Sequence, residues 1–382
     1  MMPPRTLALF AALALAMPAK GQEITWNAEF YDPAAETGAP ADLVLPMPCG
    51  GAMAFQRVDV PVDGPTPLDD RRVRLGSPQS DAGFTDYLIG THLRGGFTDP
   101  DPTTTFFYLS RYELTADQAA ALQGDCRDPS PRGRVPALGL SWFDGVALGR
   151  VYSEWLRTNA PDALPREGGA AGFVRLPTEV EWEYAARGGA ALDPAAFAAR
   201  TYPMPEGIDG HAWHQAVSRG GARPVGLRGA NPLGLHDLYG NAEELMLEPF
   251  RANAAGRAHG QAGGLVTRGG SYLSSPEQLY SARRAEWPMF RASDGRASAA
   301  ETFGARFVLS AHVAVDDART RALDESWQNA TAAAPGVEDD PLGALDEVIS
   351  DETDQRRAAA LHRHQRDLVV RRRVHARRCR RV

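Results

Sequence analysis

Three stretches of the chain place apolar residues at helical spacing directly after the same kind of start signal. Each begins with a Ser or Thr that is followed three residues later by a hydrogen-bonding side chain: Thr115 and Gln118, Ser141 and Asp144, Thr178 and Glu181. Such pairs form capping boxes, which satisfy backbone amides at the start of a helix. The pattern predicts three helices, the last ending at Gly188 because glycine readily adopts the left-handed conformation of a helix stop.

Shorter apolar runs elsewhere alternate with stretches rich in Gly, Pro and Asp. The runs lie at 51–58, 87–89, 106–114, 265–272 and 305–313. Runs of this length bounded by turn residues predict short strands joined by long loops. Because strands and helices are mixed and no internal repeat is visible, we expect a loop-dominated α+β domain.

The first residues have the pattern of a secretory signal peptide. Arg5 precedes an apolar run at 7–16, which is too short to span a bilayer as a permanent helix. Small residues follow at Ala19 and Gly21, where a signal peptidase requires them. We predict a signal peptide over 1–21, a periplasmic or extracellular protein, and no transmembrane segment after cleavage. The alternative is an uncleaved anchor or a buried first helix.

Charge is distributed unevenly along the chain. The net charge is −7, but eleven Arg and one Asp from residue 356 onward give +10, which leaves −17 for residues 1–355. Because binding to phosphates needs Lys and Arg on the folded surface, so acidic a body argues against a nucleic-acid partner. The basic end could bind an acidic partner, an anionic lipid surface or its own acidic body, or it could be a solvated tail.

An oxidising compartment changes the interpretation of the three cysteines. Cys49 and Cys126 could form a disulfide that closes a loop of more than 70 residues. Such a bond would stabilise the fold by roughly 4 kcal/mol. Alternatively they are two buried thiols, since the sequence does not show that their positions meet. Cys379 lies in the arginine-rich end without an obvious partner.

Six phrases in order along the chain are similar to those of one family, the formylglycine-generating enzymes or sulfatase-modifying factors. They are FYLSRYELTADQ, LGLSWFDGVALGRVYSEWL, RLPTEVEWEYAARGG, NPLGLHDLYGNAEEL, TRGGSY and FGARFVLS. One phrase would be weak support, but six in order resemble the family over residues 46–314. The resemblance implies a variant of the C-type-lectin-like fold, an α+β fold with little regular secondary structure.

Both ends of the chain lie outside the resemblance. Residues 22–45 are rich in Pro and Ala and predict an extended lead-in. Residues 315–341 predict a short helix, from Asp316 to Gln328, and a linker. Residues 342–382 predict a helical, basic tail, so the domain would carry a C-terminal helical appendage.

The resemblance implies a copper oxidase site whose thiols this sequence lacks. Active members carry two cysteines, five residues apart, after a Gly-Gly-Ser strand; they bind copper, and one captures the substrate cysteine. The matching positions here are Ser274 and Leu279, although the strand serine is retained as Ser271. A hydroxyl is a poor ligand for Cu(I) and leucine is none, so we expect neither copper nor catalytic residues. Glu243 also replaces the family's pocket tryptophan.

The resemblance also implies a structural calcium site, which this sequence retains. Its ligands would be the side chains of Asp237 and Glu244 and the carbonyls of Gly240 and Ala242. Hard oxygen ligands gathered by a tight Gly-Asn turn suit Ca²⁺. The alternative is an ordinary turn whose acids face water. The family's other calcium site is not recognisable.

Histidines offer a different metal chemistry. Four lie close together in the sequence: His211, His214, His236 and His259. Two histidines and a carboxylate can bind iron. However, iron-dependent relatives take their histidines from a separate helical domain that this chain lacks, so we expect histidines satisfied within loops. Arg306, in the last family phrase, is expected to brace the closing strand through an ion pair.

These features predict a calcium-supported pseudoenzyme that acts by binding a protein or peptide, such as a component of an envelope assembly. A rigid scaffold of this kind can present new recognition loops. The alternative is a sulfatase-modifying-type oxidoreductase or another metal-dependent enzyme acting on a protein substrate. An enzyme should show a closed pocket along 271–279 with converging His and acidic side chains, whereas a binding module should show that region filled.

Overall fold

The computed structural model describes residues 23–79, 82–333 and 359–366, together with residues 345 and 349. The predicted signal peptide, Cys379 and most of the basic tail lie outside this range. Within it, no helix combines the length and the apolar character needed to cross a membrane.

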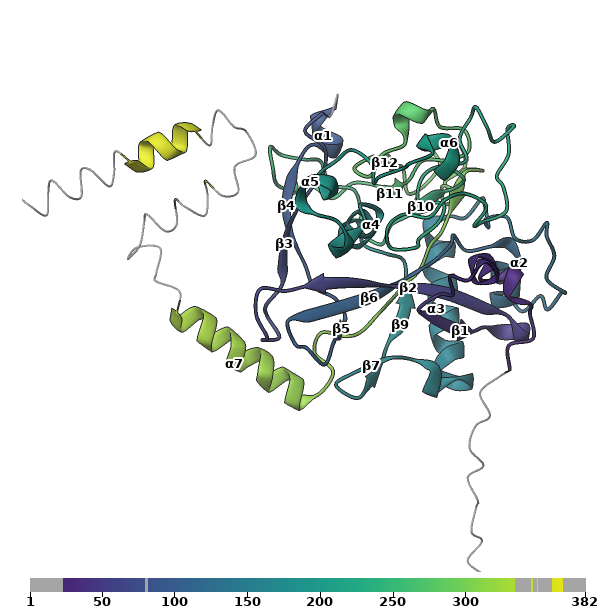
Figure 1. The fold of residues 1–382 in the computed structure, drawn as a ribbon, viewed down its shortest axis with the longest axis horizontal. Helices are drawn as coiled ribbons and strands as arrows, with labels where there is room; N and C mark the ends of the chain where they lie inside the picture. Colours follow the sequence, from purple (N-terminus) through teal and green to yellow (C-terminus); the bar gives the residue numbers. More distant parts are fainter. Residues whose placement is uncertain (1–22, 80–81, 334–344, 346–348, 350–358, 367–382) are drawn as a thin grey trace, which may run out of the picture.

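A six-stranded sheet crosses the domain (Figure 1). Its strands run in the order β1-β2-β6-β14-β9, and β5 also pairs with β6. The bounds are β1 Leu43–Pro46, β2 Ala52–Pro61, β5 Phe97–Thr98, β6 Thr104–Ser110, β9 Phe173–Arg175 and β14 Val308–Ser310. Because β14 pairs antiparallel with both β6 and β9, the sheet is completed only by a late segment of the chain.

A second sheet has four strands in the order β12-β11-β10-β13. They are β10 Glu243–Leu245, β11 Leu265–Arg268, β12 Arg284–Trp287 and β13 Phe303–Gly304. Two ribbons complete the strands: β3 Arg71–Leu75 with β4 Ile89–Leu93, and β7 Arg166–Glu167 with β8 Ala170–Ala171. The strand expected over 265–272 ends early because Gly269 and Gly270 turn the chain with φ of 84° and 71°.

All three predicted capping boxes are present. They begin α2 Ala116–Leu122, α3 Trp142–Asn159 and α4 Glu179–Ala186. At α4, Glu181 N donates to Thr178 Oγ1 at 3.2 Å, and Thr178 N donates to the Glu181 carboxylate at 2.9 Å. Gly188 stops this helix with φ of 98°, as predicted. Shorter helical turns are α1 Gly83–Asp86, α5 Pro194–Phe197, α6 Gly207–His211, η3 Pro48–Gly50, η4 Pro161–Ala163, η5 Gly189–Ala191 and η6 Pro276–Gln278.

Two buried clusters of side chains pack on opposite faces of the six-stranded sheet. Phe307 and Leu309 belong to the cluster that includes α3, whereas Val308 between them belongs to the cluster that includes α4. This alternation follows from the two-residue period of a strand. Tyr152 and Leu156, on the predicted apolar face of α3, are both fully buried. The sheet therefore fixes α3 and α4 on its two sides.

The described part of the predicted lead-in, residues 23–45, is not extended as its composition predicted. They contain η1 Ala28–Phe30, η2 Pro33–Thr37 and the start of β1. Trp26 is 7% exposed, and Asp32 forms a buried ion pair with Arg111 at 2.9 Å. The prediction was wrong because the contacts that order this segment come from residues far along the chain, which its Pro/Ala-rich composition does not show.

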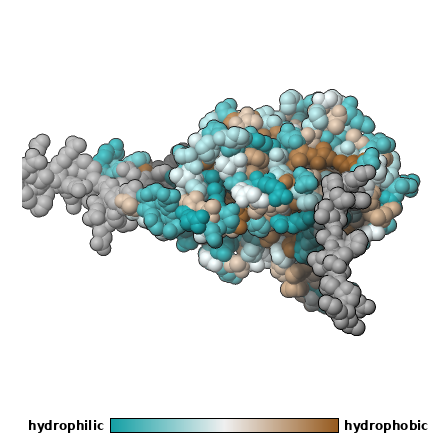
Figure 2. Space-filling model, turned by 90° about the horizontal axis from the view of Figure 1, so that it is seen from below, coloured by the Kyte–Doolittle hydropathy of each residue, from teal (hydrophilic) through white to brown (hydrophobic). Residues whose placement is uncertain are grey.

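Helix α7, Asp317–Ala333, follows the sheets and is longer than the short helix predicted. It lies along one edge of the domain in Figure 1, where Ser326 Oγ is 2.8 Å from Thr66 Oγ1. Residues 359–366 are helical, as the tail pattern predicted. The face drawn in Figure 2 is mostly hydrophilic, with a limited hydrophobic area towards one end.

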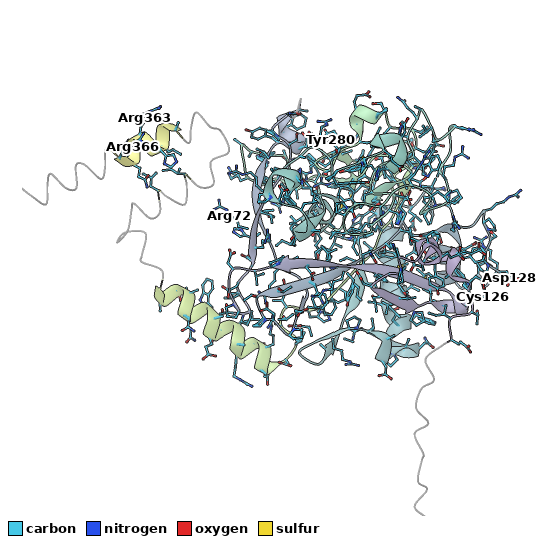
Figure 3. All side chains as sticks on the ribbon, viewed as in Figure 1. Arg72, Cys126, Asp128, Tyr280, Arg363 and Arg366 are labelled. Carbon is cyan, nitrogen blue, oxygen red and sulfur yellow. A yellow bond between two sulfur atoms is a disulfide. The ribbon has the colours of Figure 1, made fainter. Side chains whose placement is uncertain are left out.

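Cys49 and Cys126 form a disulfide, which resolves the alternative left open by the sequence. Cys49 lies in η3, and Cys126 follows α2 at the edge of the domain (Figure 3). The bond joins positions separated by 77 residues and therefore ties the turn between β1 and β2 to the end of α2. A formed disulfide agrees with an oxidising compartment.

Removing this disulfide should lower stability. In the variant carrying Cys49→Ala and Cys126→Ala, the free energy of unfolding should fall by about 4 kcal/mol because the unfolded chain regains the entropy of a long loop. Urea denaturation followed by circular dichroism would measure the difference. A reductant should destabilise the wild type and leave the variant unchanged. Identical unfolding curves for the two proteins would contradict the prediction.

Candidate functional site

The two positions where the family has cysteines lie in a tightly bonded turn after β11. Ser271, Ser274 and Leu279 are all buried, at 2%, 7% and 2% exposure. Ser271 N donates to Ser274 Oγ at 3.0 Å, and Leu273 N donates to Ser271 Oγ at 3.3 Å. The two hydroxyls therefore hold the backbone of the turn, while Leu279 packs in a core cluster.

Gly270 shows how little space this turn leaves. A Cβ atom at Gly270 would lie 2.8 Å from Leu279 Cδ2 and 2.9 Å from Ser274 Oγ. The side chains at the two family positions thus pack directly against the Gly-Gly turn. The turn is closely packed at this point, and the side chains at the two positions present no sulfur atom.

Glu243, which replaces the family's pocket tryptophan, is held by two hydroxyl groups. Its Oε2 accepts a hydrogen bond from Thr267 Oγ1 at 2.7 Å, and its Oε1 accepts one from Thr302 Oγ1 at 3.2 Å. Trp287 Nε1 donates to the same Thr267 hydroxyl oxygen at 2.9 Å. The carboxylate therefore connects strands of the second sheet.

A pocket of about 480 Å³ borders the second family position, and we call it the Leu279 pocket. Its walls include the apolar side chains of Met204, Ile208 and Leu279. Arg200 adds a cation, and its guanidinium lies 3.7 Å from the centre of the Tyr280 ring. This volume is within the range of about 300–1,000 Å³ that is typical of ligand sites.

The predicted calcium turn has the expected backbone shape. Asp237, Gly240 and Asn241 have φ of 55°, 74° and 55°, and a Cβ at Gly240 would lie 2.1 Å from the Trp213 carbonyl oxygen. Asp237 Oδ2 accepts from Gly226 N at 2.7 Å, whereas Oδ1 is buried without a partner among the residues described. An unpaired buried oxygen is costly, so Asp237 fits the role of a metal ligand.

Glu244 faces an arginine instead of an open site. Both of its oxygens accept hydrogen bonds from Arg306 at 2.7–2.9 Å, and Oε2 also accepts one from Trp182 Nε1 at 2.6 Å. A calcium ion would therefore depend on Asp237 and the two backbone carbonyls. Glu244 could join only if Arg306 released a hydrogen bond, so the four-residue ligand set stays a prediction.

Glu113 is a buried acid at this turn that sequence reasoning missed. Its carboxylate accepts from Ala242 N at 2.8 Å and from Asn241 Nδ2 at 2.7 Å. Burial, with repulsion from Asp237 and Glu244, raises the pKa of Glu113 well above its usual range. Burial also raises the pKa of Asp237 to about 6. These shifts show a poorly compensated negative charge, which a cation would stabilise.

The candidate histidines have separate partners, and His236 Nε2 is buried without a hydrogen-bond partner among the described residues. Within the described ranges, no three His, Cys, Asp or Glu side chains are grouped to hold a metal ion. His214 Nε2 is 2.8 Å from Asp209 Oδ1, and His211 Nδ1 is 3.2 Å from a backbone carbonyl oxygen. His236 stacks on Tyr112, and burial lowers the pKa of His236 to about 4. The imidazole of His236 is therefore neutral near pH 7.

Substitution of Arg306 should be strongly destabilising. Arg306→Met would leave buried carboxylates without their guanidinium and should lower the free energy of unfolding by about 3–5 kcal/mol. The matched control is Arg150→Met, whose ion pair with Glu154 is 61% and 62% exposed. Because exposed pairs contribute little, this control should lose less than about 1 kcal/mol in urea denaturation. Equal losses of unfolding free energy in the two variants would show that the buried pair does not stabilise the fold more than an exposed one.

A solved structure shares this fold. Treponema denticola variable protein 1 aligns with a TM-score of 0.51 and 17% identity, covering 71% of this chain and 99% of that one. PvdO from Pseudomonas aeruginosa aligns with a TM-score of 0.47 and 19% identity, covering 71% and 99%. At 17% identity the likeness to the Treponema denticola protein concerns the fold alone.

Sequence comparison gives the family. Chaperone protein LppX of Paenibacillus barcinonensis is 27% identical over 188 residues, which cover 40% of this chain and 65% of LppX. The chain thus spans slightly less than two thirds of that relative. Residues 81–311, which include the turn after β11 and the Leu279 pocket, match the sulfatase-modifying factor enzyme 1-like domain. This match covers more than half of the chain, which therefore belongs to the sulfatase-modifying factor family and has its formylglycine-generating-enzyme-like α+β fold.

Proposed function

We propose that this protein is a binding module on the family scaffold, which recognises a protein or peptide and does not oxidise cysteine. The observation that carries the proposal is the state of the two cysteine positions. Ser274 bonds the turn and Leu279 packs in the core. Neither side chain can bind Cu(I) or form a mixed disulfide. Cys49 and Cys126 cannot replace them, because they are bonded to each other.

The Leu279 pocket is the surface that we propose for the ligand. Its apolar walls suit a hydrophobic side chain of a peptide, and the exposed Arg200 offers a partner for a carboxylate. Leu273, on the adjacent turn, is 49% exposed and adds apolar contact area. A few apolar anchors with one charged group at the edge are typical of peptide-binding surfaces.

A periplasmic or extracellular location, with an envelope protein as the ligand, belongs to the same proposal. The disulfide supports it, since such bonds persist mainly in oxidising compartments. The predicted signal peptide is consistent with that compartment. LppX is a chaperone protein, and a relative with that role supports a protein ligand for this chain.

Peptides selected from a random library against the protein should bind through the Leu279 pocket. Met204→Ala removes part of its wall, so the affinity of the selected peptides should fall about tenfold through lost apolar contact. Fluorescence anisotropy with labelled peptides would measure the change.

Leu227→Ala is the matched control, because Leu227 is 53% exposed and does not line the pocket. This variant should bind the selected peptides like the wild type. Two outcomes would contradict the proposal: equal loss of affinity in both variants, or conversion of a peptide cysteine to an aldehyde by the purified protein.

We also propose that a calcium ion stabilises the turn over residues 237–242. The unpaired Oδ1 of Asp237 and the excess of buried carboxylates support it. Arg306 limits the part that Glu244 can take. The ion would supply positive charge and an oxygen-coordinating centre at a turn with three left-handed residues.

Chelation of calcium should lower the melting temperature of the metal-loaded protein by several degrees. An ion that binds only the folded state stabilises that state by mass action. Asp237→Asn should abolish this response. Asp209→Asn is the control and should retain it, because Asp209 is an exposed residue that pairs with His214. Differential scanning calorimetry would measure the shift. An unchanged melting temperature, in protein that contained calcium before chelation, would rule out the ion.

A further inference from the structure

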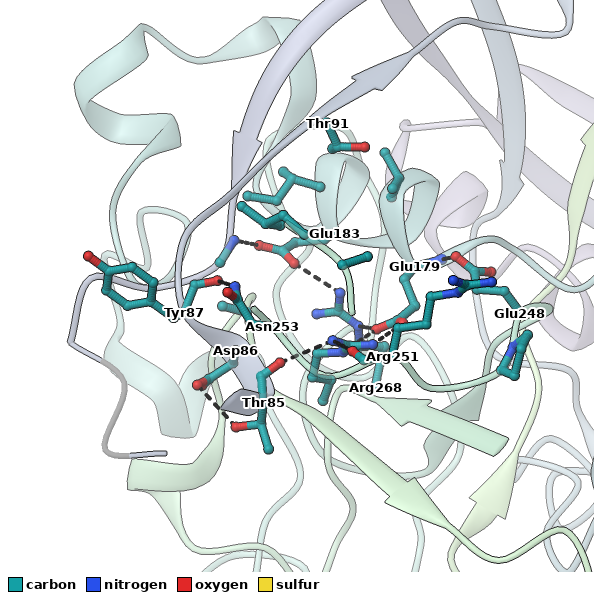
Figure 4. A pocket seen from close by; sticks show the side chains of 18 residues that line it. Thr85, Asp86, Tyr87, Thr91, Glu179, Glu183, Glu248, Arg251, Asn253 and Arg268 are labelled. Atoms are coloured by element: carbon teal, nitrogen blue, oxygen red, sulfur yellow. Dashed lines mark hydrogen bonds and ion pairs between the residues drawn. The ribbon is translucent and has the colours of Figure 1, made fainter. Parts of the chain in front are cut away.

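A second cavity, of about 170 Å³, lies between the β3–β4 ribbon, α4 and the second sheet (Figure 4). We call it the ribbon pocket, and it shares no lining residue with the Leu279 pocket. Leu75, Ile89 and Val180 are among its apolar walls, and the exposed residues Pro249 and Arg251 lie at its opening to solvent. The cavity is therefore partly apolar and accessible.

The buried arginines around the ribbon pocket are already paired. Arg268 bonds to Glu179 at 3.1 Å and to Glu183 at 2.9 Å. Arg284 pairs with Glu179 as well, and its remaining terminal nitrogen donates to two backbone carbonyls. Arg187 bonds to Glu183 at 2.8 Å. Because these guanidinium groups are used within the protein, the pocket does not offer a set of free cations to an anion.

Glu248 also lines the pocket, and it forms no ion pair with an arginine among the described residues. Its Oε1 accepts from Glu179 N at 2.8 Å, while its Oε2 is buried and has no hydrogen-bond partner. Burial raises the pKa of Glu248 to about 7, and Glu179 and Glu181 add repulsion. Ionised Glu248 is therefore under-compensated, and a cation placed beside it would be stabilised.

We propose that the ribbon pocket binds a primary ammonium group on a short aliphatic stem, with Glu248 as its counter-ion. One available oxygen suits a single ammonium better than the two-pronged fork of a guanidinium. The terminal torsion of a glutamate is soft, so the carboxylate of Glu248 can adjust its orientation when an ammonium group enters. A volume of 170 Å³ is smaller than that of drug-sized sites, which start at about 300 Å³, and suits one lysine-like chain.

The ammonium group can come from a free alkylamine or from a lysine side chain of a peptide. Butylamine and an acetylated, amidated Gly-Lys-Gly tripeptide represent these two sources. Isothermal titration calorimetry on the full chain at pH 8 should show saturable binding of butylamine. Butan-1-ol, which has the same stem and no charge, should not bind. Tighter binding of the tripeptide than of butylamine would identify a peptide as the source, and the reverse order would identify a free amine.

Glu248→Gln keeps the shape of the side chain and removes its charge. Butylamine affinity should fall at least about tenfold in this variant, since hydrogen bonds to charged groups contribute strongly. Glu154→Gln is the control, because the Glu154 carboxylate is 62% exposed on α3 and lies outside the pocket. It should bind butylamine like the wild type. The melting temperature of each variant would verify folding.

The pH dependence separates a counter-ion from a merely structural residue. Glu248 is faced by Glu179 and Glu181 from α4, by Arg175 from β9 and by Arg268 from β11. Butylamine stays charged well above neutrality, so only the carboxyl group should limit binding at low pH. Affinity should be constant above pH 8 and fall towards tenfold per pH unit below pH 6. Absence of saturable butylamine binding, equal affinity in Glu248→Gln, or a flat pH profile would overturn the proposal.

Discussion

The buried guanidinium of Arg306 connects segments that the chain order keeps far apart. It bonds to Glu244 in β10 and donates to the carbonyls of Ser110, at the end of β6, and of His236, before the turn over residues 237–242, at 2.8 Å each. Both Arg306 and Glu244 are 0% exposed. Since a buried ion pair is stable only when its hydrogen bonds are complete, the two sheets and the turn must keep one relative position.

Local signals were predictable from the sequence and distant contacts were not. The capping box of Thr178 and Glu181 is defined by four consecutive residues, so the start of α4 could be predicted. By contrast, Glu113 bonds to a turn that follows much later in the chain, and no neighbouring residue indicates this. Asp32 likewise needs Arg111 as its partner. The family phrases located the candidate site in the sequence. The residues that surround this site could be identified only from the folded structure.

The turn after β11 explains why the fold persists without the family's thiols. Its geometry depends on two glycines with positive φ and on the hydroxyl groups of Ser271 and Ser274, which bond backbone amides. Leu279 adds apolar packing. None of these contacts requires sulfur. Serine and leucine at the two cysteine positions of the family can therefore keep the turn in its shape.

Helix α4 contacts two groups of buried charged residues, one around Arg306 and one around Arg268. Trp182 donates to Glu244 beside Arg306, whereas Glu179 and Glu183 hold Arg268 at the base of the ribbon pocket. The carboxylate of Glu181 takes part in the capping box and also forms an ion pair with Arg175 at 2.8 Å. A helix whose side chains are committed on all sides has little freedom to vary. The recognisable phrase around α4 therefore reflects structural contacts and does not by itself indicate catalysis.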